Sequence, residues 1–159
     1  MIVRGRIATG VLVALALLAG PSRAQEPTGS DDPFGAFDPA RDDPAVLAGI
    51  AAEASRQGTL PELRGWLDSL RMEGMAGPHA LVYWGALSLE GGIDPDTVAA
   101  AFERHIASHV DDSEALAAFV QVLEANAAID QADRLRRAVR GMGIEPLVGM
   151  PERALDRTG

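Results

Sequence analysis

Two histidines one helical turn apart are the residues of this 159-residue chain that come nearest to a reactive pair. His105 and His109 stand at i and i+4, a spacing that puts both imidazole rings on one face of a helix. Glu103, Asp111 and Asp112 are close in sequence. Imidazole and carboxylate groups bind zinc or copper, so a metal ion held by His105 and His109 is one hypothesis. We favour a structural alternative, in which His105 faces the core and His109 interacts with the helix C-terminal dipole, because the pair lacks a third ligand.

The sequence carries no pattern typical of an enzyme. It has no cysteine, no nucleophile elbow and no glycine-rich phosphate-binding loop. We therefore expect a protein that is not an enzyme and that needs no cofactor.

A group of arginines near the C-terminus is the one basic cluster in the sequence. Its members are Arg134, Arg136, Arg137 and Arg140. Two acid-to-base pairs at i, i+4, Asp130 with Arg134 and Asp133 with Arg137, each contribute about 0.2 to 0.5 kcal/mol on a helix surface. Arg136 and Arg140 have no such partner along the helix and are candidates for holding an acidic segment.

The N-terminus has the pattern of a secretory signal peptide. Arg4 and Arg6 precede an apolar run over residues 7–19, and Ser22-Arg23-Ala24 offers small residues at a cleavage site. The run is too short to span a bilayer, which takes roughly 20 residues. We expect cleavage after Ala24, residues 1–24 as the signal peptide, and a periplasmic or secreted protein with no stable membrane insertion.

The expected mature chain is strongly acidic. Without residues 1–24 it has 11 arginines, no lysine and 23 acidic residues, a net charge of −12. Such a charge disfavours nucleic acid as a partner. Residues 25–43 are rich in proline, glycine and aspartate, which predicts a flexible acidic linker before the folded domain.

Apolar residues at helical spacing, punctuated by capping residues, predict six helices after the linker. Asp43 and Asp94 precede prolines as N-caps, the run Asp111-Asp112-Ser113-Glu114 again supplies capping groups, and Thr59 with Glu62 has the form of a capping box. The expected helices span about 44–57, 60–73, 78–90, 95–110, 112–126 and 130–142.

The spacing of these helices repeats. Pro44, Pro78 and Asp112 begin the first helix of each pair at intervals of 34 residues, and the helix-ending residues Gly58, Gly92 and Asn126 share the interval. In the central unit, Leu81-x2-Trp84-Gly85-x2-Ser88 stands where tetratricopeptide repeats have Trp-x2-Leu-Gly-x2-Tyr. Val98-x3-Phe102 stands where that family has Ala-x3-Phe. Residues 44–146 thus resemble tetratricopeptide or Sel1-like repeats.

The resemblance implies an all-α fold of three antiparallel helix hairpins stacked as a short right-handed solenoid, followed by a capping segment and tail over residues 147–159. It also implies a protein-interaction module, an adaptor or scaffold of an envelope complex, whose first helices line a groove for a peptide. The groove positions carried over from the family are Val82, Ala86, Leu89, Glu90, Glu114, Ala117, Gln121 and Glu124. Their acidic members favour a basic partner segment. The alternatives are a small periplasmic metal-binding protein that uses His105 and His109, and a structural or regulatory subunit of an envelope complex.

Overall fold

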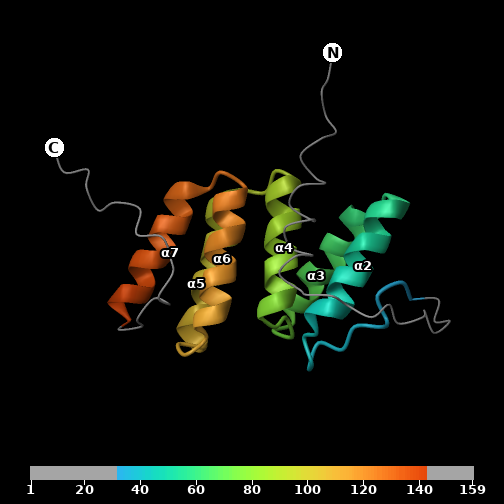
Figure 1. Ribbon diagram of the computed structural model, residues 1–159, viewed down its shortest axis with the longest axis horizontal. Helices are drawn as coiled ribbons and strands as arrows, with labels where there is room; N and C mark the ends of the chain where they lie inside the picture. The colour runs from blue at the N-terminus through green and yellow to red at the C-terminus, as the bar shows by residue number, and fades with distance from the viewer. Residues whose placement is uncertain (1–31, 143–159) are drawn as a thin grey trace, which may run out of the picture. The chain divides into compact units, whose positions relative to one another are not determined.

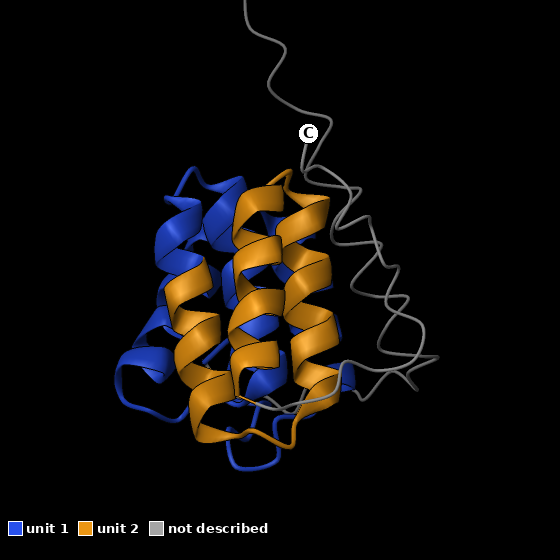
Figure 2. Ribbon diagram, turned by 90° about the vertical axis from the view of Figure 1, so that its left-hand side faces the viewer, with its two compact units in different colours: residues 1–98 blue, residues 99–159 orange. Residues whose placement is uncertain are grey.

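The computed structural model describes residues 32–142, and these residues form six helices and no strand (Figure 1). This confirms the all-α fold class. The chain divides into two compact units at residues 98 and 99 (Figure 2). The expected signal peptide, the first residues of the expected linker and the expected tail at 147–159 lie outside the described residues.

The first unit is built from three helices, α2 (Pro44–Gln57), α3 (Leu60–Met72) and α4 (Pro78–Glu90). α3 packs on α4, and α2 packs on both. Leu47, Leu63 and Leu67 are almost completely buried, and every residue of α4 from Ala80 to Ser88 is buried. Apolar residues occupy nearly the whole circumference of this stretch, and its side chains are accordingly buried in every direction.

The second unit contains most of α5 (Pro95–Ser108), together with α6 (Ser113–Ala125) and α7 (Ile129–Gly141). These helices lie side by side in Figure 2. The rings of Phe102 on α5 and Phe119 on α6 stack in parallel with centroids 4.2 Å apart, and neither side chain is exposed. α7 contributes Ala132, Leu135 and Val139 to the buried side.

Carboxylate caps begin several helices where the sequence predicted them. Asp43 accepts a hydrogen bond from the Ala45 amide at 2.8 Å, and Asp112 accepts one from Ala115 at 2.9 Å. The Asp94 carboxylate accepts from the Asp96 amide at 3.2 Å. The prediction of a capping box at Thr59 is wrong, because the Thr59 side chain makes no capping hydrogen bond. Its backbone φ of −105° with ψ of 26° is not the extended conformation in which a cap hydroxyl reaches forward.

The first helix of each predicted pair ends in the same local structure, which α3 also adopts, with Gly74 left-handed and the Met75 amide bonded to the Leu70 carbonyl. The amides of Thr59, Ile93 and Ala128 bond back to the carbonyls of Ala54, Ser88 and Leu123, a 6→1 bond that closes each helix with a left-handed residue. The left-handed residues are Gly58, Gly92 and Ala127. Asn126, predicted for the third position, precedes the left-handed residue. The interval of 34 therefore widens to 35 in the third pair, where the helix also begins one residue later, at Ser113.

Replacing Ala127 by glycine is expected to stabilise the protein by about 1 kcal/mol, because a left-handed conformation strains residues that carry a Cβ. Ala127 has a φ of 59°. The matched control is Ala125→Gly in the last turn of α6, where glycine is expected to cost roughly 0.5 to 1 kcal/mol. Denaturant unfolding of both variants checks the pair, and a loss of stability at position 127 would contradict it.

The last part of the expected linker forms turns. Residues 32–41 contain backbone bonds from Gly35 to Asp32 and from Phe37 to Phe34, at 3.2 and 3.0 Å. The rings of Phe34 and Phe37 both contact Trp66 on α3. The apolar residues of this segment therefore pack against the helical domain.

Candidate functional site

The groove positions on α4 are largely covered. Val82 and Ala86 are buried, whereas Leu89 and Glu90, at the C-terminal end of the helix, are partly exposed. Of these four positions, only the two in the last turn of α4 therefore offer side chains that another molecule can touch.

Glu90 is the titratable member of that turn. One of its carboxylate oxygens, Oε1, is buried without a hydrogen-bond partner. Burial raises the pKa of Glu90 above its ordinary value, because the charged form loses hydration. At neutral pH the carboxylate is thus held in surroundings that favour the neutral acid.

Glu90→Gln is expected to stabilise the protein near neutral pH, by no more than about 1 kcal/mol because much of the side chain still reaches water. The folded-state pKa is raised, so the stability linked to this carboxyl group is present below its unfolded pKa of roughly 4.3 and is lost as pH rises through the folded pKa. The advantage of glutamine should grow with pH over that window. Urea midpoints at about pH 4 and about pH 7 check this, with Glu114→Gln as an exposed control; an equal advantage at both pH values would contradict it.

The groove positions on α6 are more open. Glu114 and Gln121 are exposed, and Ala117, which lies between them on the same face, is partly exposed. The three residues follow i, i+3 and i+7, so they form one stripe along the helix. We call this stripe the α6 face.

Glu124, the fourth predicted position on α6, has an internal partner. Its Oε1 accepts a hydrogen bond from Arg136 Nη2 at 2.6 Å, and Arg136 also binds Asp133 at 2.9 Å. Burial lowers the pKa of Arg136, but the hydrogen bonds and charges of Glu124 and Asp133 outweigh this, and the pKa is raised. Charge reversal at Glu124 would leave a mostly buried arginine without its main partner, so such a variant would test folding together with binding.

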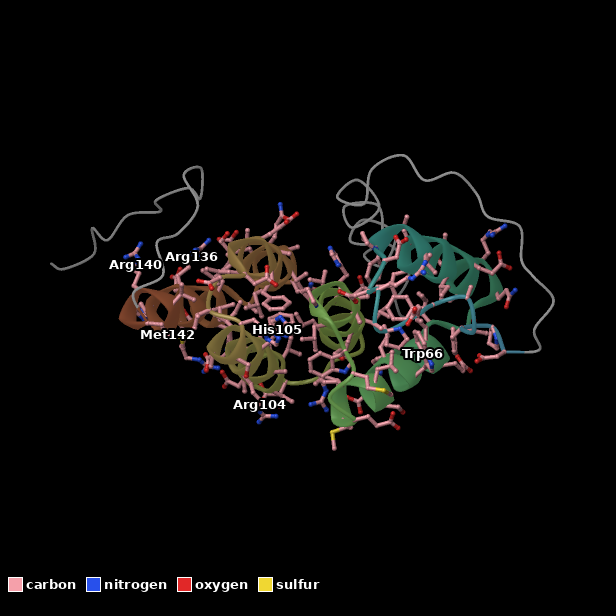
Figure 3. The ribbon with its side chains drawn as sticks, turned by 90° about the horizontal axis from the view of Figure 1, so that it is seen from below. Trp66, Arg104, His105, Arg136, Arg140 and Met142 are labelled. Carbon is pink, nitrogen blue, oxygen red and sulfur yellow. The ribbon has the colours of Figure 1, made fainter. Side chains whose placement is uncertain are left out.

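The arginine cluster pairs differently from the prediction. Arg134 binds Glu103 on α5 at 2.8 Å, and Arg136 binds Glu124 on α6, so both ion pairs connect neighbouring helices of the second unit. The prediction that Arg136 has no partner along its own helix is wrong, because it pairs with Asp133 at i, i+3. Figure 3 shows Arg140 at the far end of α7, and its side chain is exposed.

The two histidines differ in burial and in their contacts. The His105 side chain is 8% exposed and meets the Phe119 ring edge-on with centroids 5.6 Å apart. His109 is exposed, and its Nδ1 lies 3.0 Å from the His105 carbonyl oxygen in the last turn of α5. For this bond Nδ1 carries the proton, which places a donor against the negative end of the helix.

The geometry of the two rings does not converge on an ion. The imidazoles stack with centroids 4.3 Å apart and planes 16° apart. A ring nitrogen binds a metal along its own plane at about 2.0 to 2.1 Å, so nearly parallel rings direct their lone pairs side by side. Across residues 32–142, no three His, Asp or Glu side chains are grouped so that they could hold a metal ion.

A cap that joins distant parts of the first unit was not predicted. Asp42 is 9% exposed and accepts hydrogen bonds from the first amides of α4, from His79 at 2.7 Å and from Ala80 at 2.9 Å. Its Oδ2 also lies 3.0 Å from His79 Nδ1. The residue at the usual N-cap position, Gly77, provides no side chain, and a Cβ there would lie 2.5 Å from Asp42 Cγ. The sequence feature that could have revealed this remote cap is a glycine directly before a helix that begins with proline. Glycine has no side chain to accept a hydrogen bond from the first amides of the helix.

Comparison with known proteins gives no relative: no family model, no curated protein and no solved structure matches this chain. None of the helices in the described ranges is long and apolar enough to cross a membrane.

Proposed function

We propose that this protein is an exported interaction module that binds a segment of another protein, as an adaptor or scaffold in an envelope complex. The observation that carries the proposal is the α6 face, where Glu114 and Gln121 are exposed on either side of a small residue. A small side chain between two polar ones lets a bound backbone approach the helix, while the polar ends hydrogen-bond to it.

The charge of the chain supports a basic partner. The sequence carries a net charge of −9, or −12 after the expected cleavage at Ala24, and the exposed charge on the α6 face is acidic. Opposite charge across an interface speeds association and excludes acidic competitors. A segment rich in arginine or lysine is the partner chemistry that these features favour.

In this proposal the three helix pairs stack as the short right-handed solenoid that the tetratricopeptide resemblance implies. The recurrence of capped starts and left-handed ends at intervals of 34 and 35 residues supports the repeat. Periplasmic or secreted location follows from the signal-peptide pattern and belongs to the same proposal.

The double substitution Glu114→Lys/Gln121→Lys is expected to weaken partner capture about tenfold, because it reverses the charge of the α6 face. The measurement is affinity capture from an envelope extract with the immobilised chain, followed by titration of the captured protein. The control is Gln57→Lys/Glu73→Lys, which makes the same charge change at exposed positions of the first unit. Equal capture by the wild type and the α6 variant, or equal loss in both variants, would contradict the proposal.

A further inference from the structure

Two aromatic rings from outside the helices pack on one tryptophan. Phe34 stacks on Trp66 with centroids 5.0 Å apart and planes at 26°, and Phe37 meets the same ring edge-on at 5.6 Å and 82°. Both are favoured aromatic geometries. Phe37 is 6% exposed and Phe34 is partly exposed, so the contact removes most of one ring and part of another from water.

The segment that carries these rings, residues 32–41, is held by side chains more than by its backbone. Its backbone–backbone hydrogen bonds within the described ranges all stay inside the segment or reach Asp42. Pro33, Gly35 and Pro39 keep it out of helix and sheet. We call it the strap. Beyond the rings, its C-terminal end is fixed by Asp42, which caps α4.

Trp66 lies on α3 beside the described loop that precedes α2 (Figure 3). It is partly exposed even with the strap in place. Without the strap, a large apolar ring would face water, together with the surface that Phe37 now covers. This is the composition of an interaction hot spot, in which a tryptophan accepts apolar anchors at the centre of the contact.

We propose that the Trp66 surface of α3 is a docking site for a segment of another protein that carries two aromatic side chains three residues apart, and that the strap is its intramolecular occupant. The proposal rests on the function proposed above and adds the chemistry of a partner. The partner chemistry follows from the occupant, since Phe34 and Phe37 show which rings and which spacing the surface accepts.

The tether makes the strap a competitor. A covalently linked occupant acts at a high effective concentration, and the apparent affinity of any free segment falls by the fraction of molecules whose site is open. Release of the strap leaves Asp42 on α4, so the helical unit retains its cap while the aromatic site opens.

The test uses a fluorescent synthetic peptide of the strap, residues 32–41 (DPFGAFDPAR), and the full chain with Phe34→Ala/Phe37→Ala. Saturable binding at least tenfold tighter to the variant than to the wild type is expected. A peptide with both phenylalanines replaced by alanine should not bind, and Trp66→Ala in the variant background should abolish binding. Absence of binding to a variant that keeps its helical circular dichroism would overturn the proposal.

If the double variant loses helicity, Phe34→Ala alone replaces it, because Phe34 is the more exposed ring. Tighter peptide binding by this variant than by the wild type supports the proposal, and equal binding overturns it. A wild-type dimer that disappears in the variant would also overturn it, since the occupant would then be the strap of a second copy. The variant Glu114→Lys/Gln121→Lys separates the two proposals. If the strap peptide does not bind, but this variant loses partner capture as expected, only the Trp66 site is rejected.

Discussion

Asp42→Ala is expected to lower the free energy of unfolding by about 2 to 4 kcal/mol. Two α4 amides lose a charged acceptor, and the Ala80 residue that carries one of them is fully buried. A buried donor left without a partner costs its full desolvation energy. Alanine also adds strain, because Asp42 has a φ of 46°, a conformation that aspartate tolerates better than alanine.

Two variants separate the cap from the strain. Asp42→Gly removes the carboxylate but accepts the left-handed backbone, so it should be more stable than Asp42→Ala by about 1 kcal/mol. Asp43→Ala removes an exposed cap with one amide partner and should cost only about 1 kcal/mol. Urea unfolding followed by circular dichroism gives all three values. A loss at Asp42→Ala no larger than that at Asp43→Ala would refute the remote cap.

Phe119→Ala is expected to cost about 3 to 5 kcal/mol, the range for deleting a fully buried phenylalanine. Its ring stacks on Phe102 and lies perpendicular to the His105 ring, so truncation removes two ring contacts between α5 and α6. The neighbours include a second rigid ring, which limits how far the core can close around the missing volume.

Phe119→Leu is the matched control for this substitution. Leucine restores most of the apolar volume without the stacking, and its cost should be near 1 kcal/mol. Val110, an exposed apolar residue before α6, supplies a second control, since Val110→Ala should change stability by less than about 0.5 kcal/mol. Thermal and urea unfolding check the series. Equal losses for Phe119→Ala and Phe119→Leu would show that stacking, rather than volume, sets the energy.

Several helix starts could be predicted because they depend on groups close in sequence. Asp43, Asp94 and Asp112 each cap an amide two or three residues ahead, and apolar residues at helical spacing mark the intervening turns. The prediction at Thr59 failed at the same local scale, since the type and spacing of residues do not fix the backbone angle of the cap. The prediction of the residue that ends α6 failed for a similar reason. Asn126 tolerates a left-handed backbone, yet it is Ala127 that adopts this conformation.

Contacts between elements could not be predicted from spacing. Arg136 on α7 pairs with Glu124 on α6 as well as with Asp133 on its own helix. The i, i+4 rule applies only to residues of one helix, so it could not predict the pair with Glu124. Asp42 looked like part of a solvated acidic linker because its partners are 37 and 38 positions away. Phe34 and Phe37 lie 32 and 29 positions before Trp66, so spacing along one element could not show their contact with it either.

The predicted groove positions differ in exposure. Glu114 and Gln121 are open, whereas Val82 is buried and Glu124 is paired. A family's groove positions specify which side of a helix is considered, but burial depends on what packs against that side in this chain. The stacking of His105 on His109 likewise follows from rotamers that spacing leaves undetermined.

Asp42 and Ala80 come together only after the 37 residues between them have been synthesised. During synthesis, α2 and α3 leave the ribosome before the helix whose first turn Asp42 completes. Closing a loop of this length carries an entropic cost that a local cap does not. The first unit thus cannot reach its final form before the start of α4 meets a carboxylate that precedes α2, and α4 is the last of its three helices to be synthesised.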